Sequence, residues 1–210
     1  MLVAMLSELL QKWRRPRIGT ADALAKFLER NAWMVSQKNV IGYCTVKTNL
    51  PMSELLREKP FADAYDIAIW EAYAAVLADL VAVAETYLRS HAERRAPEVA
   101  AALGATYEAL LVAHPLPPHR SAGWGREVAA VRRRLGESLA TVPKSIRHIS
   151  ATSADRIVAT LPIHERLRAP DAPAVVAGVQ FMMVGLAHEF ESRLDGAAIV
   201  ADMLAAREAE

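Results

Sequence analysis

The chain is poor in the residue types that stabilise small scaffolds or bind nucleotides through loops. Its 210 residues include one cysteine, nine glycines and 6% aromatic residues. Cys44 has no second cysteine with which to form an internal disulfide, so a core of apolar side chains must hold the fold together. The glycines are scattered and form neither a P-loop nor a dinucleotide-binding fingerprint. These absences exclude a disulfide-stapled scaffold and the two common glycine-loop nucleotide sites.

Motifs for catalysis and metal binding are also missing. The sequence has no Gly-x-Ser-x-Gly, Glu-x-x-His, His-Glu-x-x-His or Cys-x-x-Cys. His188 and Glu191 have the i, i+3 spacing that can grip one metal ion. They lie opposite a complete apolar stripe of the same helix, so we expect His188 to face solvent. The sequence therefore predicts no catalytic residue, no metal site and no cofactor.

What the chain has in abundance is alanine and other apolar residues at helical spacing. Apolar residues make up 53% of the chain, and residues 61–93 contain neither proline nor glycine. One stripe of this stretch carries large apolar side chains, and the opposite side carries alanines with Asp63, Glu71, Asp79 and Glu85. A helix of that length spans roughly 45–50 Å. We therefore predict an all-α, elongated multi-helix bundle with two long alanine-rich helices.

Prolines separate the periodic segments and define the expected helices. We place helices at residues 2–14, 20–48, 61–94, 97–114, 121–140 and 172–207. Thr20 and Ser121 are the expected N-caps of two of them. Residues 141–173 read as an irregular connection with a short helical turn near 153–160. The whole chain, 1–210, is expected to be one domain.

The helix at 20–48 supplies the main candidate for a ligand site. Leu24 begins an apolar face, and Asn31, Lys38 and Thr45 follow it at steps of seven. If this seam faces inward, Lys38 needs a carboxylate partner, for which Glu71 and Asp79 are the candidates. The predicted pocket residues are Asn31, Lys38, Thr45, Gln37, Glu71, Asp79 and Trp70. In the alternative, the helix rotates near Trp33 and Lys38 extends to water.

Basic residues concentrate in two parts of the chain although the net charge is only +1. Residues 1–40 hold seven basic and three acidic side chains, and residues 119–170 hold ten and four. The second region suggests an anion-binding patch made of Arg147, His148, Arg166 and Arg168. Aromatic residues do not interleave with these charges, and overall charge is near neutral, so we expect no nucleic-acid partner.

Residues 1–16 have the pattern of a short amphipathic helix. One face carries apolar residues, and the end of the segment is basic: Leu2, Met5, Leu6, Leu9, Leu10 and Trp13, then Lys12, Arg14 and Arg15. Such a helix packs on its own bundle or on a second subunit more often than on a membrane interface. A membrane-surface role is the alternative.

From these patterns we expect a non-catalytic helical protein that acts through protein–protein contacts, with a homo-oligomer as the favoured assembly. The alternatives are a binder of a small hydrophobic or anionic ligand at the Asn31–Lys38–Thr45 seam and a peripheral membrane protein. We find no segment that reads as a signal peptide or a transmembrane helix, and expect a cytoplasmic location. The alanine and arginine bias suggests a bacterial source.

Overall fold

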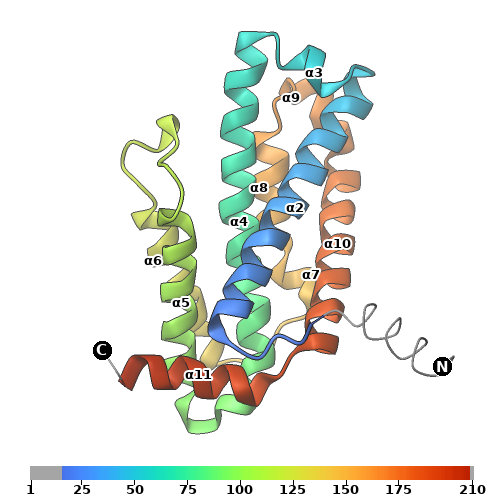
Figure 1. Ribbon diagram of the computed structural model, residues 1–210. Coiled ribbons are helices and arrows are strands. Elements are labelled where there is room, and N and C mark those ends of the chain that lie inside the picture. The colour runs from blue at the N-terminus through green and yellow to red at the C-terminus, as the bar shows by residue number, and fades with distance from the viewer. Residues whose placement is uncertain (1–15, 209–210) are drawn as a thin grey trace, which may run out of the picture.

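The computed structural model describes residues 16–208 and confirms the all-α prediction (Figure 1). The amphipathic segment predicted at 1–16 lies almost wholly outside the described residues. The helices and 3₁₀ turns are α2 (Ala21–Thr48), α3 (Met52–Leu55), α4 (Lys59–Ala92), η1 (Glu93–Arg95), α5 (Ala96–Val112), η2 (Pro118–Arg120), α6 (Gly125–Leu139), α7 (Ile146–Ile149), α8 (Ala151–Thr160), α9 (Glu165–Arg168), η3 (Ala169–Asp171), α10 (Ala172–Arg193) and α11 (Gly196–Glu208).

Helix α4 is the central element of the bundle. It contacts α2, α5 and α8 most extensively, and it is buried on nearly all sides from Ala68 to Glu85. Its alanines let these neighbours approach closely, since a methyl group takes little space between helix axes. The alanine-rich side of α4 is therefore an internal helix contact. Buried apolar residues of all the long helices join in one continuous cluster around it.

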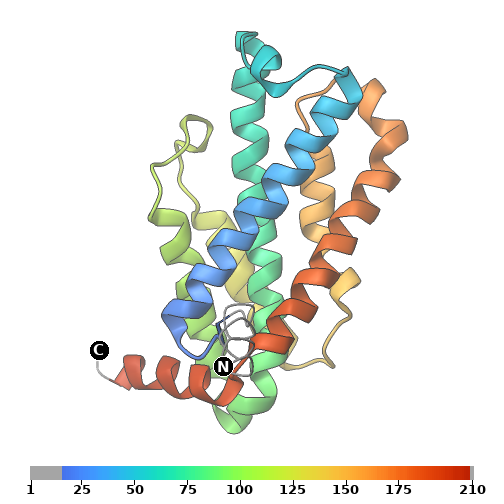
Figure 2. The same cartoon turned by 45° about the vertical axis from the view of Figure 1, so that its right-hand side comes forward.

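The remaining long helices surround α4 in two groups. Helices α2 and α10 lie along one side, α5 and α6 form a shorter pair on another, and α11 crosses the end of the bundle (Figure 1). The view turned by 45° also places α10 at the outside of the bundle (Figure 2). One long face of α10 is thus directed away from the core.

The capping prediction is correct at Thr20 and wrong at Ser121. The Thr20 hydroxyl accepts a hydrogen bond from the Ala23 amide at 3.1 Å, as an N-cap should. Residues 118–124 instead form a 3₁₀ turn and a bend, in which Gly123 has a left-handed φ of 74°. Helix α6 therefore begins only at Gly125.

The last predicted helix, 172–207, is in fact two helices. Ile18 is buried and pairs in parallel with Leu194: its amide donates to the Arg193 carbonyl at 2.9 Å, and its carbonyl accepts from the Asp195 amide at 2.8 Å. The Arg193 carbonyl and the Asp195 amide therefore bond to Ile18, whereas in a continuous helix they would bond to residues of the same helix. Helix α10 ends at Arg193, and α11 starts at Gly196 in a new direction.

The connection predicted at 141–173 is more helical than expected. It contains α7, α8 and α9, and the short turn expected near 153–160 is the ten-residue helix α8. Ser153, Ala154 and Ile157 of α8 are buried against α4. The connection is thus part of the core and positions residues of the site described next.

Candidate functional site

Three carboxylates of α4 are buried in the middle of the protein. The exposed fraction is 6% for Glu71, 0% for Asp79 and 3% for Glu85. All three lie on the side of α4 that meets α6 and α8. A buried carboxylate is costly unless charged or hydrogen-bonding groups surround it, so the partners of these three define the chemistry of this seam.

Glu71 lies in a cluster of cations at one end of the seam. Arg120 donates from Nε to Glu71 Oε1 at 2.6 Å, and His119 Nε2 lies 2.9 Å from the same oxygen. Arg120 also donates from Nη1 to Glu127 Oε1 at 2.6 Å, and Arg156 Nη1 is 3.3 Å from Glu71 Oε2. Burial works to raise the pKa of Glu71, but these partners outweigh it and hold that pKa below the ordinary range.

Asp79 is the most deeply buried of the three. Arg134 of α6 donates to Asp79 Oδ1, and the Ser153 amide donates to Oδ2 at 2.8 Å. Arg134 also donates from Nη2 to the Ile149 carbonyl at 2.8 Å, so it ties α6 to both α4 and α7. Burial nevertheless raises the pKa of Asp79, because its desolvation exceeds the combined effect of Arg134 and Ser153.

Glu85 is paired at the other end of the seam. Arg89, one turn further along α4, donates from Nε and Nη2 to its two oxygens at 2.7 and 2.8 Å. Ser138 of α6 donates from Oγ to Oε2 at 3.1 Å. Arg89 also donates from Nη1 to the Thr141 carbonyl at 2.9 Å, and this hydrogen bond anchors the start of the connection to α7.

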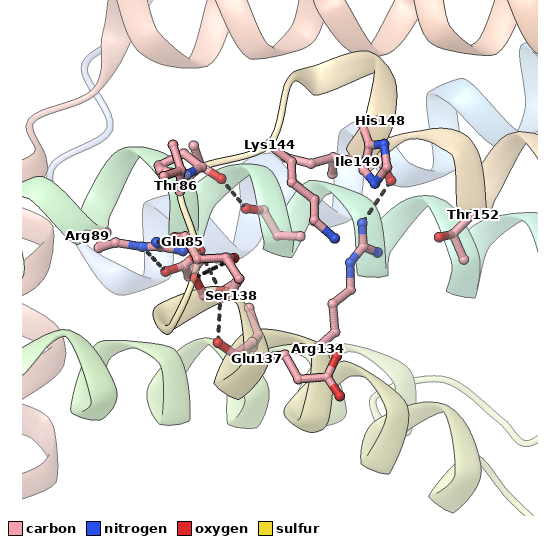
Figure 3. Close-up of a pocket in the computed structure, with 15 residues that line it drawn as sticks. Glu85, Thr86, Arg89, Arg134, Glu137, Ser138, Lys144, His148, Ile149 and Thr152 are labelled. Carbon is pink, nitrogen blue, oxygen red and sulfur yellow. Dashed lines mark hydrogen bonds and ion pairs between the residues drawn. The ribbon is translucent and has the colours of Figure 1, made fainter.

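Arg134 lies between two hollows on the surface of this seam. One hollow, of about 290 Å³, is lined by Glu85, Arg89, Arg134, Lys144 and His148 among others (Figure 3). The second, of about 270 Å³, is lined by Glu71, Arg120, Arg134, Arg156 and neighbouring alanines of α4. Arg89, Arg120, Arg134 and Arg156 are engaged with the buried carboxylates, whereas Arg133, which also lines the second hollow, lies near the exposed Glu137. The charges of this seam therefore balance within the protein, as structural ion pairs do.

The expected pairing of Lys38 with Glu71 or Asp79 is wrong. Lys38 is exposed, and both carboxylates pair with arginines from elsewhere in the chain. Helix α2 turns Lys38 toward the outside of its contact with α10. There Lys38 lines a hollow of about 490 Å³ with Asn39, Tyr43, Lys47 and Asp171. The alternative rotation, in which Lys38 reaches water, is the one that the structure has.

The other residues of the predicted ligand seam are not gathered into one cavity. Asn31 is buried and donates to the Phe27 carbonyl at 2.7 Å, while Thr45 donates to the Ile41 carbonyl at 3.0 Å. Both polar groups are thus satisfied by their own helix. Gln37 is exposed, and Trp70 packs edge-on against Trp33 at 4.9 Å between ring centroids.

The four residues of the predicted anion patch fall into two separate pairs. Arg147 and His148 belong to α7, Arg166 and Arg168 to α9, and the ten residues of α8 lie between them. Arg168 donates to the Leu161 carbonyl at 2.8 Å and so supports the turn after α8. Only His148 lines the hollow beside Arg134.

Sequence reasoning missed the roles of Arg120 and Arg134. The run Arg132–Arg134 reads as a solvated helix face, and Arg133 indeed has 73% of its side chain exposed. Arg134, however, lies next to Val131 and Leu135 of the core stripe, and its side chain is 30% exposed. Its position at the edge of an apolar stripe was the available signal.

Among residues 16–208, no group of three or more His, Cys, Asp or Glu side chains is placed to hold a metal ion.

The outward face of α10, defined here as Ala174, Ala177, Gly178, Phe181, Val184, Gly185 and His188, is exposed, and it is apolar except for His188. Phe181 exposes 82% of its surface and Val184 exposes 40%. A methyl group at Gly185 would meet nothing within 4 Å, and at Gly178 only Asn39 at 3.9 Å. Within the described part of the chain, no element covers this face.

Among residues 16–208, two helical stretches are long and apolar enough to cross a bilayer by length and composition, Lys59–Val112 and Glu165–Arg193. The first is 78% buried in its most apolar window, as expected of a core helix, whereas the second is only 17% buried. The second stretch contains α10. This helix therefore exposes apolar surface that a core helix would bury.

Comparisons with known proteins give no further guide to this face or to the seam. No protein-family model matches the chain, and neither curated proteins nor solved structures similar to it were found.

Proposed function

We propose that this protein acts through protein–protein contacts, and that the outward face of α10 contacts a second copy of the chain. The observation that carries the proposal is the exposure of Phe181 in the middle of an apolar helix face. Contiguous apolar surface on a folded protein marks interaction sites more often than isolated apolar residues do. An aromatic residue near the centre of such a patch is the usual anchor of an interface.

The face is complementary to itself in shape. Phe181 lies between Gly178 and Gly185, so a bulky ring is flanked by positions without a side chain. In an antiparallel pair whose two-fold axis passes at the level of Met183, Phe181 of each copy lies opposite Gly185 of the other. A two-fold axis makes both contacts at once, as isologous interfaces require.

The charges at the two ends of the face support the same arrangement. Lys38 lines the hollow beside the first half of α10, and Glu191 belongs to the second half. Lys47 already pairs with Asp171, and Glu189 with Arg193, each at 2.7 Å. An antiparallel pair brings Lys38 of one copy toward the end of α10 that carries Glu191 in the other. Opposite charges across the rim favour this orientation over the parallel one.

The test is the molar mass of the full chain over a range of concentrations, measured by light scattering and sedimentation velocity. We expect reversible dimerisation, and Phe181→Glu should weaken it at least about 30-fold, the effect of removing a 2 kcal/mol anchor. Val112→Glu is the matched control, because Val112 is 66% exposed and lies on α5. It should leave the dissociation constant unchanged.

Two results would overturn the proposal. One is a dissociation constant that responds equally to Phe181→Glu and Val112→Glu. The other is binding of the wild-type chain to vesicles with anionic headgroups, lost in Phe181→Glu, without any dimerisation. The second result would assign the face to a membrane surface.

A further inference from the structure

The hollow drawn in Figure 3 carries two basic side chains that the buried carboxylates do not use. Lys144 precedes α7 and His148 belongs to it, and both line this hollow of about 290 Å³. Both residues are exposed, and neither side chain forms a hydrogen bond or an ion pair with any part of the chain that the structure describes. Two basic groups thus meet at one hollow without an anion of their own.

The carboxylates that line the same hollow already have cations. Glu85 accepts hydrogen bonds from Arg89 at 2.7 and 2.8 Å. Glu137 has 70% of its side chain exposed and lies 3.8 Å from Arg133 of its own helix. The positive charge of Lys144 is therefore not matched by a carboxylate within the hollow.

Arg134 brings a third cationic group to this space. A guanidinium has five N–H donors, and the acceptors given to Arg134 by residues 16–208, Asp79 Oδ1 and the Ile149 carbonyl, take two of them. Figure 3 shows the side chains of Arg134 and Lys144 extending toward one another across the hollow. Cations that face each other repel, and an anion between them replaces that repulsion with charge-assisted hydrogen bonds to both.

An apolar wall adjoins these cationic groups and bears on the kind of anion that fits. Leu135, Val142, Pro143 and Ile149 line the hollow, and Thr152 adds a hydroxyl group to its polar side. The tetrahedral oxygens of a phosphate group can accept from a guanidinium and an ammonium at the same time. The volume, near the lower end of the range for small-molecule sites, leaves room for a small organic group against the apolar wall.

We propose that this hollow binds the phosphate group of a small phosphate monoester between Arg134 and Lys144, beside His148, with the organic part against the apolar wall. Arg134 donates from N–H groups that Asp79 does not use, so the buried ion pair stays intact. None of the residues that line the hollow belongs to the outward face of α10. The site is therefore independent of the proposed self-association.

Titration of the full chain with phenyl phosphate at constant ionic strength, followed by proton–nitrogen NMR, tests the site. We expect saturable shifts of the amides of residues 144–152, and Lys144→Gln should raise the dissociation constant at least about tenfold. Arg147→Gln is the matched control, because Arg147 is exposed, precedes His148 in α7 and does not line the hollow. It removes the same charge and should change the constant by less than about twofold.

Two results would overturn the phosphate site. One is a set of shifts that does not saturate, and the other is equal weakening by Lys144→Gln and Arg147→Gln, since a diffuse positive surface explains either. Inorganic phosphate is the second probe and identifies the source of the phosphate group. Weaker binding of inorganic phosphate than of phenyl phosphate supports the monoester, whereas equal or tighter binding overturns the monoester and assigns the site to the free ion.

Discussion

Helices α4 and α10 are both long and apolar, yet they place their exceptional residues in opposite environments. The 34-residue α4 carries three carboxylates into the core, and the 22-residue α10 presents a phenylalanine and a valine to solvent. The buried carboxylates find arginines on α6, on α4 itself and in the loop before α6. The exposed face of α10 finds no cover among residues 16–208. The two helices thus contrast a region whose charged groups are paired within the described fold with one that no described residue covers.

The largest change in the free energy of unfolding is expected when Arg134, the cation that pairs with Asp79, is removed. Arg134→Leu leaves Asp79 buried without its cation and should lower the free energy of unfolding by about 3–5 kcal/mol. Urea unfolding followed by circular dichroism measures it. Arg133→Leu is the matched control, because the exposed Arg133 lies 3.8 Å from Glu137 and should cost no more than about 1 kcal/mol.

The double variant Asp79→Leu/Arg134→Leu should recover much of that loss, since replacing both members of a buried pair removes the unpaired charge. If Arg134→Leu and Arg133→Leu cost the same, the Asp79 pair would contribute no more than a surface contact. The distinction between the seam and the surface would then be lost.

Glu71 and Asp79 should make contributions to stability that respond to pH with opposite signs. The pKa of Glu71 lies below its ordinary 4.5 in the folded protein, so Glu71 stabilises the fold above that pH and loses its effect as pH falls through the folded value. The pKa of Asp79 lies above its ordinary 3.8, so its contribution is present at low pH and declines as pH rises through the folded value.

Glu71→Gln should therefore cost about 2–3 kcal/mol at pH 7 and progressively less below pH 4.5. Asp79→Asn should cost more at acid pH than at pH 7. Urea unfolding of both variants and the wild type at pH 3.5 to 7 would measure the two slopes. Parallel slopes would contradict the opposite pKa directions.

The smallest effect is expected on the outward face of α10. Gly185→Ala should raise the free energy of unfolding of the monomer by about 0.5–1 kcal/mol, because glycine in a helix interior is unfavourable and the added methyl group meets nothing within 4 Å. In the proposed dimer, the same methyl group would occupy the space opposite Phe181 of the second copy, so dimerisation should weaken. Thermal unfolding at low concentration and sedimentation velocity measure the two effects. A variant with stronger dimerisation would contradict the proposed packing of Phe181 against Gly185.

The sequence pattern shows which carboxylates share a face of α4, but it does not show which arginines pair with them. The alanine side of α4 with Glu71 and Asp79 was visible as a pattern, since helical period alone decides which residues share a face. The partners of those carboxylates are Arg120 and Arg134, which are 49 and 55 residues away along the chain. Nothing local marks such a pair. Lys38, suggested as their partner by its place two steps of seven residues after Leu24, instead faces outward.

By itself the sequence determined the helical class and most helix positions among residues 16–208, because propensity, periodicity and proline placement act over a few turns. Only the tertiary structure decided that Ile18 divides α10 from α11, that arginines neutralise the buried carboxylates, and that α10 keeps Gly178, Phe181 and Gly185 outside. Those outcomes depend on which helices pack side by side. That choice is made by long-range burial and by the pairing of buried charges, which no local pattern records.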